Sequence, residues 1–286
     1  MDLRNDNPAP RLRWSGLSDR GKVRKNNEDS FLGLQFDAHE AHLLGKLGDA
    51  SLENADLTFA VSDGMGGAMA GEFASRITVE KITRLMPPAF KQAASGLEAG
   101  RFDVLEELFG EVHRALTFLG DSYEECDGMG VTLSLCWFTP RCMYFGHVGD
   151  SRIYYLPVAG TLSGVEGGGM KQLSEDDTFV GWLYRNGKLT EREARSHPRK
   201  TVLQKALGAG HQFVDPQVGS VIYESGDIFV LCTDGVIDGL WDNQLTDFIR
   251  APDPATTAFD PAQRLVRAAV ENSGRDNTTA IVVEVL

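Results

Sequence analysis

Short runs of alternating large and small residues recur along the chain, the pattern of β-strands buried against a core. In LTFAVS the larger residues Leu57, Phe59 and Val61 occupy every second position. Five further runs have strand character: VTLSLCWF (131–138), CMYFGHV (142–148), RIYYL (152–156), DIFVLCT (227–233) and TTAIVVEVL (278–286). Because strands mostly follow strands, the pattern predicts antiparallel sheets rather than regular strand–helix–strand units.

Helical periodicity is clearest between Val104 and Leu119, where apolar residues recur at three- and four-residue spacing. A second helix is predicted after Gly71, with an inward face made of Ala70, Phe73, Ala74, Ile77 and Leu85. The sequence therefore predicts an α+β fold in which helices cover antiparallel sheets within a single domain.

Two shorter helices are indicated by their ends. Thr190 and Glu193 form a capping box, and the helix that they open is expected to stop at 197–198, where a proline follows a histidine. A proline directly after an aspartate at 260–261 opens another helix, which Gly274 closes.

The remaining stretches are polar. Segments 35–56 and 161–171 are expected to be surface excursions and candidate partner contacts. Residues 1–13 are expected to form a flexible N-terminal arm, which leaves 14–286 as one domain. No apolar signal segment and no run of roughly 18 apolar residues is present, so we expect a cytoplasmic protein with no membrane contact.

Composition narrows the function classes. The chain has 41 acidic and 28 basic residues, a net charge of −13, which argues against nucleic acid or anionic lipid as the main partner. The four cysteines lack C-x-x-C spacing, so a structural zinc site is not expected. Nothing indicates an oligomer, and a monomer is the default expectation.

Four aspartates fall at the ends of predicted strands. Asp63 and Asp234 each follow a strand and precede a glycine, Asp150 follows another strand, and Asp276 stands just before the last one. A single Asp-Gly pair is more often a plain turn. In an antiparallel sheet, however, these ends can share one edge, where four carboxylates would repel one another unless cations were bound.

The chemistry of such a cluster limits the cation. All donors are oxygens, which favours Mg²⁺ or Mn²⁺. Two ions about 4 Å apart can lower the pKa of a shared water for in-line attack at phosphorus. A phosphate also needs an anchor, and Arg24, four residues before Glu28 and Asp29, offers a planar fork for two hydrogen bonds. Taken alone, an arginine in such a basic run is more often a solvated loop residue.

These segments together resemble the metal-dependent Ser/Thr protein phosphatases of type 2C, in their bacterial branch. The matching stretches follow the family's order from about residue 15 to the C-terminus: SDRGKVRKNNEDS, VSDGMGG, GMGVTLSLC, HVGDSRIY, LSEDDTFVGWLYRNGKLTEREARSHP, KALG, CTDGVID and GRDNTTAIVV. The resemblance implies two stacked antiparallel sheets flanked by helices on both outer faces, and a catalytic domain that dephosphorylates phosphoserine and phosphothreonine.

The resemblance also implies roles for individual residues. Asp63 corresponds to the carboxylate that bridges two metal ions, with Asp234 and Asp276 completing the first ion's acids. The second ion is implied to take the Gly64 carbonyl and Glu28, and a third, weaker ion to take Asp150 with Asp234. The phosphate-gripping residue corresponds to Arg24, while Asn277 and Asp29 support the site.

Two departures from relatives accompany this resemblance. Met65 stands where many eukaryotic members have a candidate general-acid histidine, and Asp176-Asp177-Thr178 replaces a frequent Asp-His-Ser in the mobile flap, 176–198. Neither touches the implied metal ligands. We assign no catalytic role to His147, expected to lie in the core.

Other functions compete with this interpretation. A dinucleotide site fails because GMGGAMAG lacks the G-x-G-x-x-G spacing, and a serine hydrolase built on Ser151 lacks a partner histidine in a convincing motif. A catalytically inactive phosphoprotein-binding module and a phosphatase for small phosphate esters remain open. The implied partners are phosphorylated proteins, among them a bacterial Ser/Thr kinase or its substrates.

Overall fold

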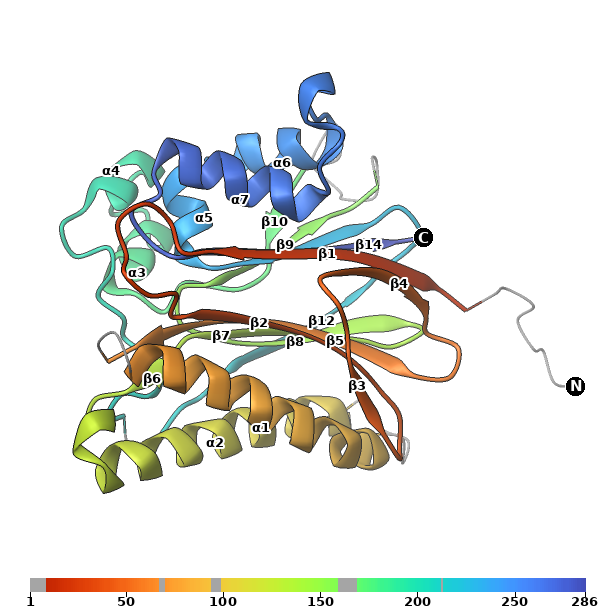
Figure 1. Ribbon diagram of the computed structural model, residues 1–286, viewed down its shortest axis with the longest axis horizontal. Helices are drawn as coiled ribbons and strands as arrows, with labels where there is room; N and C mark the ends of the chain where they lie inside the picture. Colours follow the sequence, from red (N-terminus) through yellow and green to blue (C-terminus); the bar gives the residue numbers. More distant parts are fainter. Residues whose placement is uncertain (1–8, 67–69, 94–98, 159–168, 212) are drawn as a thin grey trace, which may run out of the picture.

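Two antiparallel β-sheets lie face to face at the centre of the molecule (Figure 1). The computed structural model describes residues 9–66, 70–93, 99–158, 169–211 and 213–286. The six-stranded sheet has the order β10 (Lys171–Gln172), β9 (Arg152–Leu156), β13 (Ile228–Cys232), β14 (Thr278–Val285), β1 (Arg11–Asp19) and β4 (Leu47–Ser51). The eight-stranded sheet has the order β11 (Leu207–Gly208), β6 (Gly130–Val131), β5 (Asp56–Met65), β7 (Leu133–Phe138), β8 (Cys142–Val148) and β12 (Gln217–Ile222), while β2 (Asp29–Phe36) pairs with β5 and with β3 (Ala41–Leu43).

Helices cover both outer faces of this sandwich (Figure 1). The eight-stranded sheet is covered by α1 (Ala70–Ala93) and α2 (Ala99–Ser122), and the six-stranded sheet by α5 (Asp234–Gly239), α6 (Asp242–Arg250) and α7 (Pro261–Asn272). Two short helices, α3 (Phe179–Arg185) and α4 (Glu191–Ser196), stand beside one end of the sheets. Short 3₁₀ turns lie at Glu124–Cys126 and Pro254–Thr256. The predicted α+β sandwich is confirmed.

The apolar core has three layers, one between each pair of neighbouring structural layers. The middle layer lies between the two sheets and includes Phe59, Phe138 and Phe229. The outer layers lie under α1 and α2 and under α5 to α7. All four cysteines are buried with free thiols, and no helix among the described residues is long and apolar enough to span a membrane.

The alternation in β5 explains how one strand serves two core layers. Leu57, Phe59 and Val61 point into the layer between the sheets, whereas the small Ala60 faces the layer under α1. Large side chains therefore fill the space between the sheets, and the small one lets a helix lie close to the strand. The other five predicted strand runs also form strands in the structure.

The predicted helices are present, with one error in the inward face of α1. Five members of the α2 stripe are buried: Val104, Leu105, Leu108, Val112 and Leu116. In α1, however, Phe73 is 46% exposed, because the buried stripe runs through Ala70, Ala74, Thr78, Ile82 and Met86. That stripe advances by four residues at each step and leaves Phe73 at its flank.

The two predicted sets of helix ends are confirmed. Thr190 and Glu193 complete the capping box of α4, and Asp260 accepts a hydrogen bond from the Gln263 amide at the start of α7. Gly274, two residues after α7, has a φ of 60°, a conformation that costs glycine little.

Two boundaries differ from expectation. Segment 35–56 is not an irregular excursion, because it contains β3 and β4, which extend one edge of each sheet and are joined by a short connection. The strand β1 begins at Arg11, so 11–13 belong to the sheet rather than to the arm. The rest of the expected arm, 1–8, and most of the expected loop 161–171 lie outside the described residues.

Candidate active site

A cavity of about 560 Å³ opens at one end of the two sheets. It is lined by Arg24, Glu28, Asp63, Gly64, Asp150, Asp234 and Asp276, together with residues from the β1–β2 loop and from 201–203. These seven are the metal and phosphate residues predicted from sequence, and they come from segments spread over the whole chain. The remaining two predicted residues, Asp29 and Asn277, are buried beside them.

Strand pairing brings the acids together. Asp63 lies directly opposite Asp29 in the β2–β5 register. Asp234 is the first residue of α5, directly after β13 and Thr233. Asp150 lies in the turn between β8 and β9, and Asp276 precedes β14. The strand β5 extends to Met65, three residues further than expected, because Gly64 and Met65 pair with β6.

The carboxylates of Asp63 and Asp234 are poorly compensated by bases. Burial raises the pKa of Asp63 well above its ordinary value, and the neighbouring Asp29 and Asp234 raise it further. Burial likewise raises the pKa of Asp234, with added repulsion from Asp150. Such shifts mean that the carboxylates cannot all ionise cheaply unless positive charge enters the cavity.

Asp150 shows the same behaviour at the cavity wall. Burial and then repulsion from Asp176 raise the pKa of Asp150 to about 7, although Arg152 opposes the shift. Burial also raises the pKa of Glu28, with the Arg24 charge acting in the opposite direction. The pKa values of four acids that line the cavity, Asp63, Asp234, Asp150 and Glu28, are thus raised.

Asp29 supports the site from below. Its Oδ2 accepts hydrogen bonds from the hydroxyls of Thr233 (2.8 Å) and Thr279 (2.7 Å), while its Oδ1 is buried without a partner. Burial raises the pKa of Asp29 to about 7, although both threonine bonds favour the charged form. The two threonines were missed from sequence, although both lie within a few residues of a singled-out aspartate.

Asn277 fixes the loop that carries Arg24 and Glu28. Its Nδ2 donates to the Arg20 and Asn26 carbonyls, at 3.0 and 2.9 Å, and its Oδ1 accepts from the Glu28 amide at 2.8 Å. One buried amide side chain therefore ties both ends of the loop to the turn of Asp276. The predicted supporting position of Asn277 agrees with this geometry.

Arg24 is engaged with a predicted metal ligand. Its Nη2 lies 2.6 Å from Asp276 Oδ2, and this hydrogen bond is the main reason why the pKa of Arg24 is raised. The predicted phosphate-binding residue and the acid thus neutralise each other in the structure. Both are partly exposed, so the pair can separate at modest cost.

Gly64 occupies a position that excludes any side chain. A Cβ at Gly64 would lie 2.0 Å from the Gly71 carbonyl oxygen at the start of α1. Gly64 and Gly71 therefore allow the strand β5 and the helix α1 to approach closely.

The fit of a metal ion can be tested on the donor atoms. The buried Asp234 Oδ1 has no hydrogen-bond partner, and hard oxygen donors line the cavity, both of which suit Mg²⁺ or Mn²⁺. Among the described residues, however, no three Asp, Glu, His or Cys side chains are arranged to hold one ion together. The predicted ligands line one cavity, but Asp276 is paired with Arg24 and the ligands do not surround a common point. The ligand set therefore stays a prediction.

A hydroxyl network joins two of the acids. Thr132 Oγ1 accepts from the Asp63 amide at 3.1 Å and lies 2.7 Å from Ser151 Oγ, next to Asp150. Ser151 is fully buried in this network, which gives it a structural role instead of that of a nucleophile. Thr132 was another residue that sequence reasoning missed.

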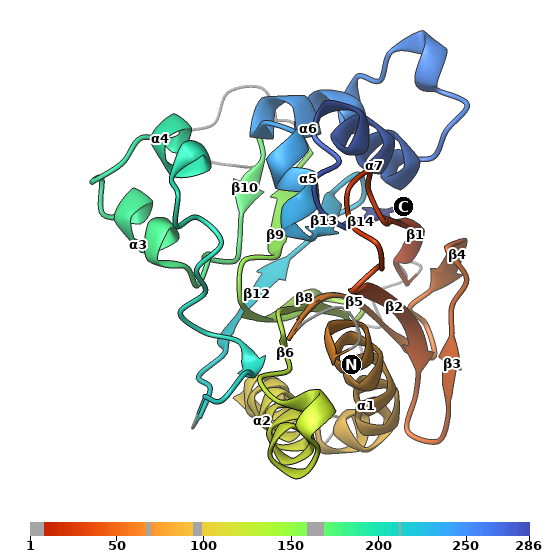
Figure 2. The same cartoon turned by 60° about the vertical axis from the view of Figure 1, so that its left-hand side comes forward.

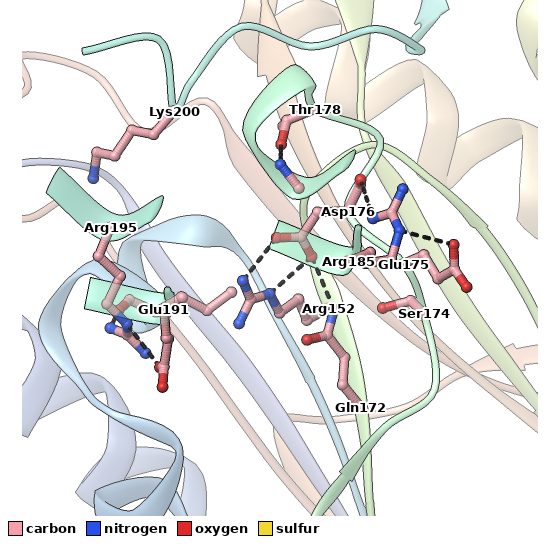
Figure 3. Close-up of polar contacts among 12 residues, drawn as sticks. Arg152, Gln172, Ser174, Glu175, Asp176, Thr178, Arg185, Glu191, Arg195 and Lys200 are labelled. Carbon is pink, nitrogen blue, oxygen red and sulfur yellow. Dashed lines mark hydrogen bonds and ion pairs between the residues drawn. The ribbon is translucent and has the colours of Figure 1, made fainter. Parts of the chain in front are cut away.

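The base of the flap holds the turn of Asp150. The Gly149 amide donates to Asp177 Oδ2 at 3.1 Å, and the Asp177 amide donates to the Gly149 carbonyl at 2.7 Å. Asp177, one of the departures from relatives, is therefore a buried structural residue. Figure 3 shows the neighbouring Asp176 bound through both oxygens to Arg152, at 2.8 and 2.7 Å.

The histidines keep non-catalytic positions. His147 is fully buried in β8, with its ring nitrogens 2.8 Å from Ser134 Oγ and 3.0 Å from the Gly149 carbonyl. Burial lowers the pKa of His147. His197 ends α4 and accepts the Arg199 amide at Nδ1. The expected structural role of His147 is confirmed.

Comparisons with known proteins agree with this geometry. The family model described as protein phosphatase 2C matches residues 46–272. The chain is 32% identical to the serine/threonine protein phosphatase PstP of Mycobacterium tuberculosis, over 96% of this chain and 45% of PstP, so it spans about half of that protein's length. It is also 30% identical to the serine/threonine phosphatase stp of Listeria innocua, over 93% of both chains.

A solved structure extends the likeness to three dimensions. The catalytic domain of PstP in complex with two manganese ions superimposes with a TM-score of 0.72 at 28% identity, over 97% of this chain and 99% of that domain. The span of the family model and the likeness to the Listeria phosphatase lead to one assignment: the chain belongs to the protein phosphatase 2C family.

Proposed function

We propose that the chain is a protein serine/threonine phosphatase that hydrolyses phosphoserine and phosphothreonine esters with the help of two divalent cations, Mn²⁺ or Mg²⁺. One observation carries the proposal: half-buried carboxylates with raised pKa values, led by Asp63 and Asp234, line the same cavity as Arg24. Such a cavity demands cations and offers a phosphate anchor. The two manganese ions of the related PstP domain support it.

The cavity residues have distinct proposed tasks. Asp63, Asp234 and Asp276 would hold one ion, and Asp63 with Glu28 and the Gly64 carbonyl the other; Asp150 and Asp234 would serve a third, weaker ion. When bound, the ions supply the acidity that turns water into a nucleophile at neutral pH. The chain itself supplies the positions of these donors, through β-strand register and the threonine hydroxyls.

Arg24 is proposed to change partner during binding. In the structure it neutralises Asp276. A cation at Asp276 would release the guanidinium, which then faces the cavity with its fork free for two phosphate oxygens. Asn277 keeps the loop in place while this exchange occurs.

The wider biological setting is part of the same proposal. Relatives named serine/threonine phosphatase occur in bacteria, and we propose a bacterial Ser/Thr kinase or its substrates as the phosphorylated partners. We further propose a cytoplasmic protein that acts as a monomer, with a single catalytic unit that starts at β1. An inactive binding module would be expected to lose a metal-binding acid, yet Asp63, Asp234 and Asp276 are all present.

The test is an assay on a phosphothreonine peptide with Mn²⁺, with EDTA, and with the Asp234→Asn variant. Turnover that needs Mn²⁺ and falls by orders of magnitude in the variant supports the proposal. Asp247→Asn, which changes an exposed aspartate of α6, is the matched control. Absence of turnover despite bound Mn²⁺ favours the binding module, and turnover of small phosphate esters alone favours the phosphomonoesterase.

A further inference from the structure

Basic residues are concentrated in the segment that contains α3 and α4. Residues 179–205, called the flap segment below, hold seven of the chain's 28 lysines and arginines but two of its 41 acids. The segment is therefore strongly cationic within a protein of net charge −13. Figure 2 shows α3 and α4 projecting from the sandwich on one side.

The flap segment borders the active-site cavity. Thr201 and Leu203 line the cavity on one side, and Val23, Arg24 and Lys25 of the β1–β2 loop line it as well. The loop is itself basic, with Arg20, Lys22, Arg24 and Lys25 in six residues. Cationic chain thus flanks the cavity mouth on two segments that are far apart in sequence.

Several exposed bases of the flap segment, of the β1–β2 loop and of the turn before Asp276 are not paired with acids of the described residues. Arg185, Arg195 and Lys200 form ion pairs with acids of the flap segment and its surroundings. In contrast, no carboxylate among the described residues pairs with five exposed bases: Lys25, Lys188, Arg192, Arg199 and Arg275. Unpaired charges on an exposed surface are free to meet a partner.

Arg199 is the best placed of these five. Its guanidinium carbon lies 4.7 Å from the centre of the Phe179 ring, a cation–π contact that holds the side chain on the surface without neutralising it. Its main chain is two residues from Thr201 in the cavity wall. Lys25 lines the cavity directly.

We infer that the two exposed, unpaired bases nearest the cavity, Lys25 and Arg199, form a cationic rim that selects phosphoproteins with acidic residues beside the phosphoserine or phosphothreonine. The inference rests on the proposed phosphatase function and adds a substrate class to it. Charge complementarity at an exposed rim acts mainly through encounter rate, and it weakens as salt increases.

The test uses three phosphothreonine peptides of equal length, whose flanking residues are glutamate, glutamine or lysine. At saturating free Mn²⁺ and an ionic strength of about 0.01 M, we expect kcat/KM for the acidic peptide to exceed that for the neutral one by about 10-fold. The lysine peptide should be the poorest. The preference should shrink at about 0.15 M, where the Debye length falls from about 30 to about 8 Å.

Charge reversals locate the preference on the rim. Arg199→Glu and Lys25→Glu should each lower the ratio of acidic to neutral kcat/KM by about threefold or more. Arg192→Glu should lower this ratio by less, because Arg192 does not line the cavity. Arg141→Glu is the matched control, because Arg141 is exposed in the β7–β8 turn at the opposite end of the sheet from Asp150. It should leave the ratio unchanged.

The outcomes separate this inference from the proposed function. Equal kcat/KM for the three peptides, or an unchanged ratio in both rim variants, overturns the inference and leaves the phosphatase intact. Stronger competition by an RNA homopolymer than by the acidic peptide, at equal charge, assigns the rim to nucleic acid and also overturns it. Absence of Mn²⁺-dependent turnover on every peptide removes the proposed function, and the inference with it.

Discussion

Two groups of acids lie next to each other at the same end of the molecule. One group lacks basic partners, and the other is paired with bases. In the active-site cavity, Asp63 and Asp234 have no basic partner among the described residues, and their pKa values are raised. In the adjoining pocket of about 120 Å³ under the flap segment, Asp176 pairs with Arg152 and Asp238 with Lys200.

The difference separates structural charge from functional charge. A carboxylate with a base bound to it contributes to holding two segments together, as Arg152 and Asp176 join β9 to the residues just before the flap segment (Figure 3). A buried carboxylate without one is a cost to the fold unless something from outside neutralises it. Asp63 and Asp234 are such costly groups, and they line the cavity where phosphate and cations are expected.

The largest effect should follow from removing a charge of the uncompensated group. Asp63→Asn should reduce Mn²⁺-dependent turnover on the order of 10³-fold or more, because a metal centre lowers the reaction barrier by several kcal/mol. The same substitution should raise the melting temperature of the metal-free protein, because it removes repulsion with Asp29 and Asp234. Calorimetry with EDTA and steady-state kinetics with Mn²⁺ measure the two effects. A variant that is both less active and less stable without metal contradicts the comparison.

The next largest effect should be the pH dependence of stability that the titration of Asp29 causes. Its pKa is about 7 in the folded chain, well above that of an unfolded chain. Its contribution to stability is therefore full below about pH 4 and lost as the pH rises through about 7, up to about 4 kcal/mol in metal-free protein. Asp29→Asn retains an oxygen for Thr233 and Thr279 and stays neutral at every pH.

The variant should consequently match the wild type near pH 4 and be more stable near pH 8. Urea unfolding of both metal-free proteins across this range measures the difference, with Asp247→Asn as the exposed control. Parallel stability curves for Asp29→Asn and wild type would mean that Asp29 is already compensated. Added Mn²⁺ should close the gap at high pH, since the ions neutralise the same cluster.

Breaking a pair of an acid and a base should lower the free energy of unfolding, whereas removing an unpaired acid should raise it. Arg152→Met leaves Asp176 without its base, at a site where the two side chains are 19% and 16% exposed. We expect a loss of about 3 kcal/mol in unfolding free energy, at the low end of the range for a broken buried pair. The double variant Arg152→Met/Asp176→Leu should recover much of the loss. Chemical denaturation of the wild type and both variants measures this effect, and equal stability of all three proteins contradicts it.

Sequence reasoning reached the fold and the aspartates that line the cavity because both leave local marks. Alternation in LTFAVS fixes which face of β5 carries Phe59, and an aspartate at a strand end is visible without knowing its neighbours. The strands β3 and β4 were not predicted, because they are short, exposed edge strands. They are formed by pairing with β2 and β1, respectively. Propensity over three to five residues is too weak to reveal them.

The contacts that assemble the site escaped for a different reason. The pairing of Arg24 with Asp276 joins residues 252 positions apart, and the bond of Thr279 with Asp29 spans 250. No local pattern encodes such a pair. The helix α5 was also missed, because Asp234-Gly235 is typical of a turn, and the helical continuation depends on packing of Val236 and Ile237 against the outer core.

The smallest effect concerns Arg195, which docks the flap segment on the helix that begins at Asp234. Its Nη1 donates to the Ile237 and Leu240 carbonyls at the C-terminal end of α5, and its guanidinium lies 4.1 Å from the centre of the Trp241 ring. Both interactions lie beside the acids that are paired with bases. Arg195→Met keeps most of the apolar stem and removes the donors, so we expect a loss of about 1–2 kcal/mol.

Its matched control is Arg192→Met, three residues earlier on α4, whose exposed side chain has no ion-pair partner among the described residues. That change should stay within about 0.5 kcal/mol of the wild type. Hydrogen exchange at 191–200 should speed up in Arg195→Met alone, because the flap segment then opens more often. If exchange rises equally in both variants, α4 is held by its own capping box and not by Arg195. Slower exchange at 234–239 than at 191–200 in Arg195→Met would show that loosening stops at the flap segment and spares the helix that carries Asp234.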